Sequence, residues 1–562
     1  MNSWKLACVS LVICSTCIGA GKLSAQVRTA WFDEFNSPAS DEDIGIGVEL
    51  DSEHNVVVAG WSEGVGTGRD ALLLKYNRTG KLLWSSYYNG TGNSDDSGSS
   101  PVIDSNDNIF LSVSADGGSA GWDFLVLKYD PNGTLLWDKR FNGTGNGTDY
   151  TGLYGALEVD PAGNAYVVGY SWSAAGHYEL VTIKYRPDGT EDWLTRYTGP
   201  HATKRNTYGW ALAFAPSGSL YVAGNTANIS GDSDYPLLKL DPATGAIIWD
   251  KLYDGAYNLD EGLYDIVLDQ SENIYLVGYS ETSGGFEYCA MKCDSSGLFQ
   301  WEGRWGGTKG YHYAWVIDVD SLGNSYVTGA SMTTGGQYDI VTVKYDAQGT
   351  REWAQRYRDS GVFGEDWGNH VEVGPDGNIY VTGRIWRYFN DGFDAVTLKY
   401  DPAGTLLWDE VYGGSVGGDD TGFEVAIDDD NNVFVAGTAR GFGTGSDALL
   451  IKYSQSPAPS LTVTPDPLQP GQHGSVQAID LEPLTLTFLA YSVVGSNPVF
   501  IPPINVTLNL TQPKQAGPAM TTDGVGSVGW GSTVHPALSG INIWFQVAQY
   551  NQVTNVVATF VL

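Results

Sequence analysis

Pairs of adjacent carboxylates stand in the variable loops of the chain, and the type and spacing of three of them suggest a metal. These pairs are Asp95 and Asp96, Asp260 and Glu261, and Asp419 and Asp420. Proteins bind Ca²⁺ through about six to eight oxygen ligands, so clustered carboxylates of this kind could hold it. Aspartate pairs are also ordinary turn formers, and none of these has the spacing of an EF-hand loop. The sequence leaves both interpretations open and suggests no other cofactor.

Aromatic side chains in variable loops form a second candidate site. Flat rings beside polar groups are the stacking platforms that sugars, peptides and protein partners use. The candidates for ligand binding are Trp172, Trp367, Trp386, Tyr388 and Phe389. Filling of the space between neighbouring sheets is the competing interpretation for any single ring.

Motifs for catalysis are missing from the sequence. It contains no nucleophile elbow, phosphate loop or paired-cysteine metal motif. The histidines near variable loops belong to different repeats and lack the spacing of metal ligands; they are His177, His201, His312 and His370. We therefore name no catalytic residue.

Two further sets of acidic residues recur along the chain. An acid begins the third strand of every repeat, and a lysine follows five residues later, as in Asp70 and Lys75. One active site does not need eight equivalent pairs, so this set is expected to be structural. A second set stands on the first strands, where a wet central channel or cation capture could explain it: Glu49, Glu158, Asp318 and Glu372.

A repeated unit must position these residues. Seven tryptophans stand four residues after a glycine, in steps of 52 to 56 residues, and Trp31 keeps the same step; they are Trp84, Trp137, Trp193, Trp249, Trp301, Trp353 and Trp408. Such a period is typical of a repeat architecture. Each repeat reads as four strands, because apolar residues alternate between Gly-Pro-Asn-Asp clusters. Short turns follow the first and third strands, so the variable loops share the opposite face, where we expect binding.

Counting the repeats predicts how the ring closes. Eight units contain the first three strands, but the last has no fourth strand after Lys452. The segment 28–35 carries the same step from Trp31 to the aromatic Phe35. We expect it to complete the eighth sheet, because closure removes two exposed edges. The predicted fold is all-β: an eight-bladed β-propeller whose N-terminal strand closes the last blade.

The repeat pattern resembles a known family. The sequence D-x-x-G-N-x-Y-V-x-G, followed by D-x-x-x-L-K-Y-D-x-x-G-x-x-x-W, looks like the bacterial β-propeller repeat called SBBP over about residues 27–453. Copies are imperfect, since Gly374 stands where the third repeat has Asp160. The resemblance implies an exported or surface protein and no shared catalytic residues. Residues 241–249 are similar, more weakly, to the tryptophan-docking motif of eight-bladed quinoprotein dehydrogenases, although the adjacent cysteine pair of those enzymes is absent.

Composition and the N-terminus indicate the compartment. A formal net charge of −35 disfavours nucleic acid and anionic membranes. Residues 1–25 read as a signal peptide, and no later run is apolar enough to span a bilayer. Removal of this signal peptide would leave two cysteines, Cys289 and Cys293. Both lie on one predicted strand, with Cα atoms about 13 Å apart, which is too far for a disulfide. We expect a monomer that is secreted or at the cell surface, with the periplasm as an alternative.

The composition changes abruptly after the last repeat. The propeller is predicted over residues 26–453 and a linker over 454–460. Residues 461–562 carry few charges and several short alternating strands, which is typical of a small Ig-like β-sandwich. A spacer or attachment module is the simplest role for it.

These observations favour a non-enzymatic binding or adhesion scaffold that takes a glycan or protein ligand on its loop-rich face. An exported enzyme is the alternative, either a polysaccharide lyase or hydrolase or a quinoprotein-like oxidoreductase. A purely structural envelope component is the third hypothesis. Bound ligand without turnover would separate the first from the second.

Overall fold

The computed structural model describes most of the predicted propeller and the strands of the C-terminal segment. In the first part it covers residues 27–455, apart from 40, 91, 119–120, 153–154, 200–205, 229–230, 256–258, 307–309, 359–363, 388–391 and 415. Beyond residue 459 it describes the backbone of the strands alone. The regular elements of these residues are β-strands, with no α-helix among them.

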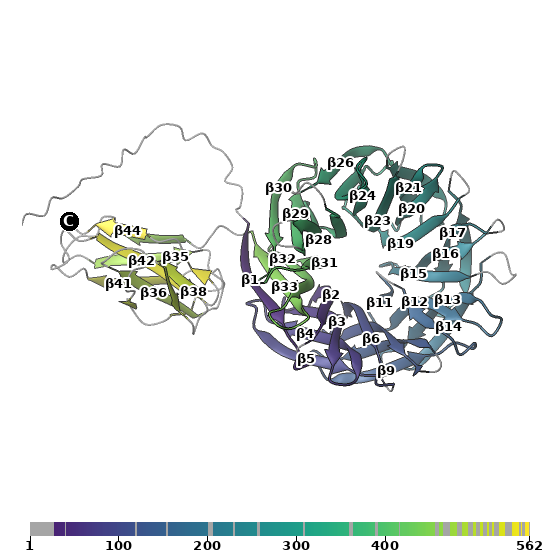
Figure 1. Ribbon diagram of the computed structural model, residues 1–562, viewed down its shortest axis with the longest axis horizontal. Helices are drawn as coiled ribbons and strands as arrows, with labels where there is room; N and C mark the ends of the chain where they lie inside the picture. Colours follow the sequence, from purple (N-terminus) through teal and green to yellow (C-terminus); the bar gives the residue numbers. More distant parts are fainter. Residues whose placement is uncertain are drawn as a thin grey trace, which may run out of the picture.

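Antiparallel sheets of four strands follow one another around a central axis (Figure 1). The strands of the first four blades are β2 (Asp43–Leu50), β3 (Val56–Gly64), β4 (Gly68–Tyr76) and β5 (Leu82–Tyr88); β6 (Asp96–Ile103), β7 (Ile109–Asp116), β8 (Trp122–Tyr129) and β9 (Leu135–Phe141); β10 (Asp149–Thr151) with β11 (Leu157–Val159), β12 (Ala165–Trp172), β13 (Tyr178–Tyr185) and β14 (Glu191–Tyr197); and β15 (Thr207–Phe214), β16 (Leu220–Ala227), β17 (Ser233–Leu240) and β18 (Ile247–Tyr253). In the third blade, β10 and β11 both pair with β12, so together they take the place of the innermost strand.

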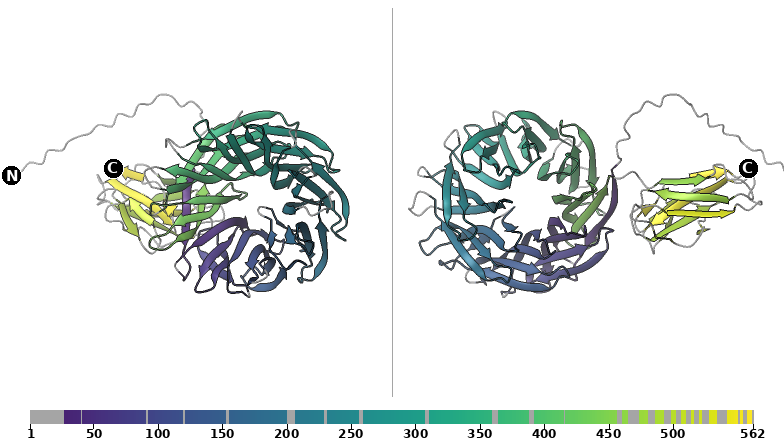
Figure 2. Two further views of the ribbon diagram at one scale, coloured as in Figure 1. Left: turned by 45° about the vertical axis from the view of Figure 1, so that its right-hand side comes forward. Right: turned by 180° about the vertical axis from the view of Figure 1, so that it is seen from behind.

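The remaining blades repeat this order. The two further views show the blades around the same axis (Figure 2). Their strands are β19 (Glu261–Leu268), β20 (Ile274–Thr282), β21 (Gly285–Cys293) and β22 (Phe299–Trp305); β23 (Gly310–Val319), β24 (Ser325–Met332), β25 (Tyr338–Tyr345) and β26 (Arg351–Tyr357); β27 (Trp367–Val373), β28 (Ile379–Arg387), β29 (Gly392–Tyr400) and β30 (Leu406–Tyr412); and β31 (Thr421–Ile427), β32 (Val433–Arg440) and β33 (Ser446–Ser454).

The N-terminal strand completes the eighth blade. Strand β1 (Arg28–Phe35) pairs antiparallel with β33, from Thr29 opposite Tyr453 to Phe35 opposite Ala448, and gives a sheet in the order β1-β33-β32-β31. The predicted fold class, including this closure, is confirmed. The first and last segments of the ring are therefore hydrogen-bonded partners, and the eighth sheet has its fourth strand.

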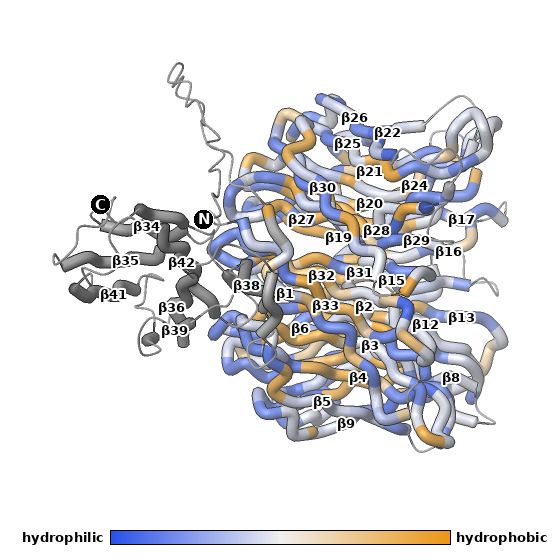
Figure 3. Tube along the Cα trace, turned by 60° about the vertical axis from the view of Figure 1, so that its left-hand side comes forward, coloured by the Kyte–Doolittle hydropathy of each residue, from blue (hydrophilic) through white to orange (hydrophobic). Residues whose placement is uncertain are grey.

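Hydrophobic cores lie between the blades rather than within one central core. Among the described residues, eight buried clusters each take side chains from two neighbouring sheets. The cluster between blades 8 and 1, for instance, combines Phe434 and Leu450 with Val58 and Leu74. The strands carry the hydrophobic segments, and many connecting loops are hydrophilic (Figure 3). Each blade thus depends on its two neighbours for burial, as in other repeat proteins.

The repeated tryptophan and lysine hold one blade to the next through a single oxygen. In blade 3, Lys184 Nζ and Trp193 Nε1 both donate to the carbonyl oxygen of Pro242, at 2.9 Å and 3.0 Å. Pro242 belongs to the turn between the third and fourth strands of blade 4. The same carbonyl position accepts both donors from the preceding blade in Arg78, Pro131, Pro187, Ala347 and Pro402.

The glycine of each Gly-x-x-x-Trp step touches the tryptophan of the preceding blade. Gly245 has a positive φ of 71°, and a Cβ on it would lie 2.6 Å from the ring of Trp193. A side chain would therefore strain the backbone and also displace the indole. The glycine and the tryptophan of one repeat consequently act at two successive interfaces, which explains why their spacing is kept.

At the interface between blades 7 and 8, a glutamine side chain supplies the acceptor oxygen that a turn carbonyl supplies elsewhere. The eighth blade has no turn between its third and fourth strands, because its fourth strand is β1. Gln455, directly after β33, places Oε1 where it accepts from Lys399 Nζ and Trp408 Nε1 of blade 7. Its Nε2 donates to the Tyr380 hydroxyl at 2.8 Å, so the side chain is held on both sides.

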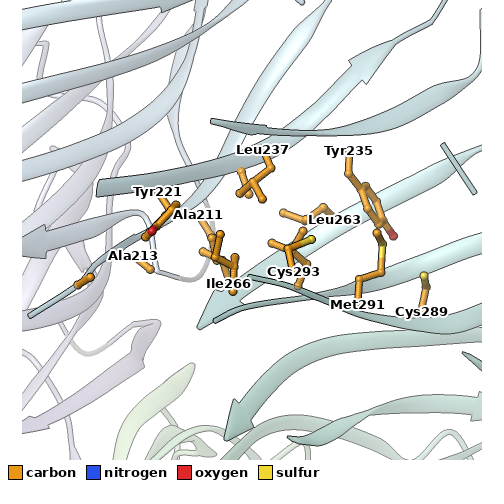
Figure 4. Close-up of a cluster of buried hydrophobic side chains, with 14 residues drawn as sticks. Ala211, Ala213, Tyr221, Tyr235, Leu237, Leu263, Ile266, Cys289, Met291 and Cys293 are labelled. Atoms are coloured by element: carbon orange, nitrogen blue, oxygen red, sulfur yellow. The ribbon is translucent and has the colours of Figure 1, made fainter. Parts of the chain in front are cut away.

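The two cysteines lie in the core between blades 4 and 5 (Figure 4). Cys289 and Cys293 are buried free thiols, as the sequence predicted. Burial raises the pKa of Cys293 to about 11, so this side chain packs as an uncharged thiol at neutral pH.

The C-terminal strands form antiparallel sheets, consistent with the predicted sandwich. One sheet has the order β34-β35-β41, from β34 (Ser460–Thr464), β35 (His473–Ile479) and β41 (Val528–Thr533). Another joins β36 (Leu486–Ser492) and β42 (Asn542–Gln549) with β39 (Lys514–Gln515), β40 (Met520–Thr521), β43 (Gln552–Val553) and β44 (Val557–Phe560), while β37 (Pro498–Ile501) pairs with β38 (Val506–Asn509).

The predicted domain boundaries remain predictions. The expected signal peptide, residues 1–25, lies outside the described residues. Among the residues that the structure describes, no helix has the length and apolar character needed to cross a membrane.

Removal of one indole tests the closure of the ring. Trp31 is 6% exposed, packs in the core between blades 8 and 1, and donates to Arg78 of blade 1. We expect Trp31→Ala to lower the free energy of unfolding by about 3–5 kcal/mol, measured by urea denaturation. Phe442→Ala is the control, because that ring is 86% exposed, and it should change stability little. Equal effects of the two substitutions would contradict closure through Trp31.

Candidate functional site

A β-bulge recurs in the innermost strand of the blades and brings one extra residue to the central axis. The register shifts between Gly209 and Ala211 in blade 4 and between Ala314 and Val316 in blade 6, so that Trp210 and Trp315 are the unpaired extra residues. Bulges commonly re-aim a side chain next to a functional site. The residues at this position are Ile46, Trp210, Tyr264, Trp315, Asn369 and Phe423, and in blade 2 the longer irregularity holds Ser99 and Ser100.

These bulge residues converge on one cavity, which we call the mouth. It has a volume of 870 Å³, lies on the side of the ring where the innermost strands begin, and takes lining residues from all eight blades. Besides the bulge residues, its lining includes Trp61, Trp122, Tyr150, Thr151, Tyr170, Trp367, Arg384 and Thr421. Because every blade contributes, the mouth exists only when the ring is assembled.

The types of side chain that line the mouth differ from blade to blade around the axis. Blades 3 to 7 supply aromatic rings that touch one another: Trp210 lies 5.4 Å from Tyr170, and Trp315 lies 4.9 Å from Tyr264, between ring centroids. Blade 2 supplies Trp122 together with small polar side chains, including Ser99 and Ser100. A ligand in the mouth would therefore meet flat apolar surfaces around much of the wall and a group of hydroxyls at blade 2.

Several hydrogen-bond donors at the mouth are buried without a partner among the described residues. They are Trp315 Nε1, Trp367 Nε1 and Arg384 Nε. The Arg384 guanidinium lies between two rings, 4.5 Å from the centroid of Trp367 and 4.3 Å from that of Phe393. Burial there lowers the pKa of Arg384. Unsatisfied buried donors are costly, so a ligand that supplies acceptor oxygens would be favoured at this place.

A second cavity continues along the axis beyond the mouth and is lined by carboxylates. Its volume is 440 Å³, and its acids are Glu49, Glu158, Asp265, Asp318, Glu372 and Glu424. Asp265 Oδ2 accepts from the Ile317 amide of the next blade at 3.2 Å, and Asp318 Oδ2 accepts from Val373 at 2.7 Å. These acids thus also connect the innermost strands around the axis.

Burial of the axial acids raises their pKa values. Desolvation, followed by the charge of Glu49, raises the pKa of Glu158 to about 7. Desolvation raises the pKa of Glu424 to about 8, although its Oε2 accepts a hydrogen bond from Ser100 Oγ at 2.5 Å. Part of this ring of acids is therefore protonated at neutral pH.

The predicted ligand-binding residues fall in different places. Trp367 lines the mouth. Trp172, at the end of β12, packs against Tyr178 with 4.9 Å between centroids, and Trp386 packs against Phe393 at 5.0 Å; neither lines the mouth. Tyr388 and Phe389 lie outside the described residues. The role of this set in binding stays a prediction.

The predicted metal ligands are distributed over three blade interfaces. The first acid of each pair accepts from a backbone amide of the preceding blade: Asp95 from Arg69, Asp260 from Ser233 and Asp419 from Phe393. The second acid of each pair is buried: Asp96, Glu261 and Asp420. Within the described residues, one group of three acids comes within metal-binding distance, and it joins Glu261 to Asp234 and Asp254. Neither partner was among the predicted metal ligands.

Sequence reasoning missed most of the mouth. Trp210, Tyr264 and Trp315 follow one another in steps of 54 and 51 residues, close to the repeat period. The signal was a repeat position whose residue type varies while the residue before it stays small or apolar. This signal was hidden because the bulge interrupts the alternation of inward and outward side chains that is expected along a β-strand.

Comparisons with known proteins leave the family open. No protein-family model and no curated protein matches the chain, so the SBBP resemblance stays a prediction. Among solved structures, BamB from Moraxella catarrhalis shares 11% identity with a TM-score of 0.43, over 76% of this chain and 100% of that one. A europium-containing methanol dehydrogenase shares 13% with a TM-score of 0.47, over 77% and 94%. The quinohemoprotein alcohol dehydrogenase of Comamonas testosteroni shares 13% with a TM-score of 0.46, over 78% of each chain.

The axial acids should make stability depend on pH. A carboxyl whose pKa is about 8 when folded and about 4.3 when unfolded contributes stability that is present below about pH 4.3 and lost as the pH rises through about 8. We therefore expect the melting temperature to fall between about pH 5 and about pH 8.5, and Glu424→Gln to reduce that fall by several degrees.

The control for this experiment is Glu191→Gln, because Glu191 is exposed at the edge strand β14. It should leave the pH profile unchanged. A melting temperature that rises with pH, or a Glu424→Gln profile identical to that of the natural protein, would contradict the assignment.

Proposed function

We propose that the protein is an exported, non-enzymatic binding protein that takes a glycan in the mouth. The observation that carries this proposal is the convergence of bulge residues from successive blades on one 870 Å³ cavity with aromatic walls. A bulge repeated at the same place in different blades, with a side chain that varies among them, is a scaffold that presents variable residues.

The chemistry of the wall favours a sugar over other ligands. A pyranose ring has an apolar face that stacks on indole and phenol rings, and its hydroxyl groups both donate and accept hydrogen bonds. The mouth offers Trp210, Trp315 and Trp367 for stacking and Ser99, Ser100 and Thr151 for hydroxyl contacts. The indole N–H groups of Trp315 and Trp367 lack partners among the described residues and suit acceptor oxygens of a sugar. A net charge of −35 disfavours strongly anionic polymers.

Export and a place at the cell surface or in the periplasm belong to the same proposal. They are supported by the predicted signal peptide, by the signature of the repeats and by the acidic composition. The C-terminal sheets would then serve as a spacer or attachment module.

Truncation of one mouth tryptophan tests the proposal. We expect Trp315→Ala to weaken binding of the best soluble oligosaccharide from a panel by at least about tenfold, because a central stacking ring contributes about 2 kcal/mol. Isothermal titration calorimetry measures the affinity. Tyr311→Ala is the matched control, since Tyr311 lies on the same strand, is 45% exposed and does not line the mouth.

Four results would overturn or redirect the proposal. Failure of every oligosaccharide to bind the folded protein would overturn it, as would binding that Trp315→Ala leaves intact. Release of shortened products from the panel would favour the exported enzyme instead. Capture of a protein ligand that competes at Trp315, with no affinity for sugars, would place a different class of ligand in the mouth.

A further inference from the structure

Three carboxylates gather between blades 4 and 5, away from the mouth. Asp234 lies at the start of β17, Asp254 follows β18, and Glu261 begins β19. One ligand oxygen from each lies within 4.8 Å of the other two. Asp234 and Glu261 are each 1% exposed, whereas Asp254 is open to solvent. None of the three lines the mouth.

Corresponding positions in other blades hold an arginine. In blades 2, 3 and 6, the residue three places after the docking tryptophan is an arginine that pairs with the acid at the start of the third strand. These pairs are Arg140 with Asp123 at 2.9 Å, Arg196 with Glu179 at 3.1 Å, and Arg356 with Asp339 at 2.8 Å. In blade 4 the register places Leu252 there, opposite Pro236. Within the described residues, Asp234 therefore lacks the arginine that its equivalents in blades 2, 3 and 6 have. Asp70 and Asp447 also lack one, but each accepts a hydrogen bond from a nearby threonine hydroxyl.

The buried acids of this cluster have few compensating contacts. Glu261 Oε1 accepts from Ser280 Oγ at 2.7 Å, but Glu261 Oε2 has no hydrogen-bond partner among the described residues. Asp234 Oδ1 accepts from Asn228 Nδ2 at 2.9 Å. Within the described part of the chain, none of the three acids forms an ion pair with lysine or arginine. Buried carboxylates without a counter-charge are costly, so a cation is favoured at this place.

We propose that Asp234, Asp254 and Glu261 bind a hard divalent cation, for which Ca²⁺ is the probe, in place of the missing arginine. Carboxylate oxygens are the ligands that Ca²⁺ prefers. Asp254 is exposed, so an ion can enter from solvent and keep water among its ligands. Because the site joins β17 and the segment after β18 to β19, the bound ion fastens blade 4 to blade 5.

The site differs from the pair suggested by the sequence. Asp260 Oδ1 accepts from the Ser233 amide at 2.9 Å, and Asp260 is outside the group of three. Its role is to hold the loop before β19 against the start of β17. Glu261 is the member of that pair assigned to the cation.

Calcium titration of the full-length protein after treatment with EDTA tests the proposal. We expect CaCl₂ to raise the melting temperature by several degrees, because an ion that binds the folded state alone stabilises it. Calorimetry should give one site, and Glu261→Gln should weaken it at least about tenfold. Asp260→Asn is the matched control and should keep the response to calcium.

The Leu252→Arg variant distinguishes a metal site from an acidic cluster that binds no ion. The new guanidinium should supply the missing counter-charge, so this variant should melt above the natural protein in EDTA and lose its response to CaCl₂. The proposal would be overturned if CaCl₂ did not change the melting temperature of the natural protein and elemental analysis found no calcium in it. A Leu252→Arg variant that responds to calcium like the natural protein would overturn it too.

Discussion

The contact of the repeated tryptophan and lysine with a turn carbonyl of the next blade, made at six of the eight interfaces in the described residues, is the interaction on which the rest of the structure depends. In blade 1, for example, Lys75 and Trp84 both reach the Pro131 carbonyl of blade 2. The isolated sheet has two apolar faces, and neighbours cover both, so no blade is stable alone. The ring closes because Trp31 repeats this contact from the N-terminal strand, while Gln455 supplies the acceptor oxygen where the last blade has no turn.

Function follows from what this scaffold leaves variable. The outer contacts fix where each innermost strand lies, and the bulge in that strand then brings one residue to the axis. Since the bulge does not depend on the identity of its extra residue, that residue can be Trp210 in one blade and Asn369 in another. The same separation operates at the blade interfaces, where an arginine pairs with the acid at the start of the third strand in blades 2, 3 and 6, and Leu252 takes the place of that arginine in blade 4.

The sequence predicted the fold well because the scaffold contacts are local and repeated. The step from glycine to tryptophan, the turns and the missing fourth strand of the eighth repeat could all be read along the chain, and Trp31 indicated the closure. The mouth could be predicted only in part. Trp367 was identified as an aromatic in a variable loop, but Trp210 and Trp315 come together only through a bulge that alternation does not reveal. Likewise, Asp254 meets Glu261 through folding between blades and not through spacing.

Amide hydrogen exchange of the full-length protein tests the central claim most directly. A ring closed by β1 opens as one unit, so the amides of β1 that pair with β33 should exchange as slowly as those within β31 to β33. Exchange of β1 on the timescale of a frayed terminal segment, while β31 to β33 stay protected, would contradict the account, because the ring would then hold together without the strand that is said to close it.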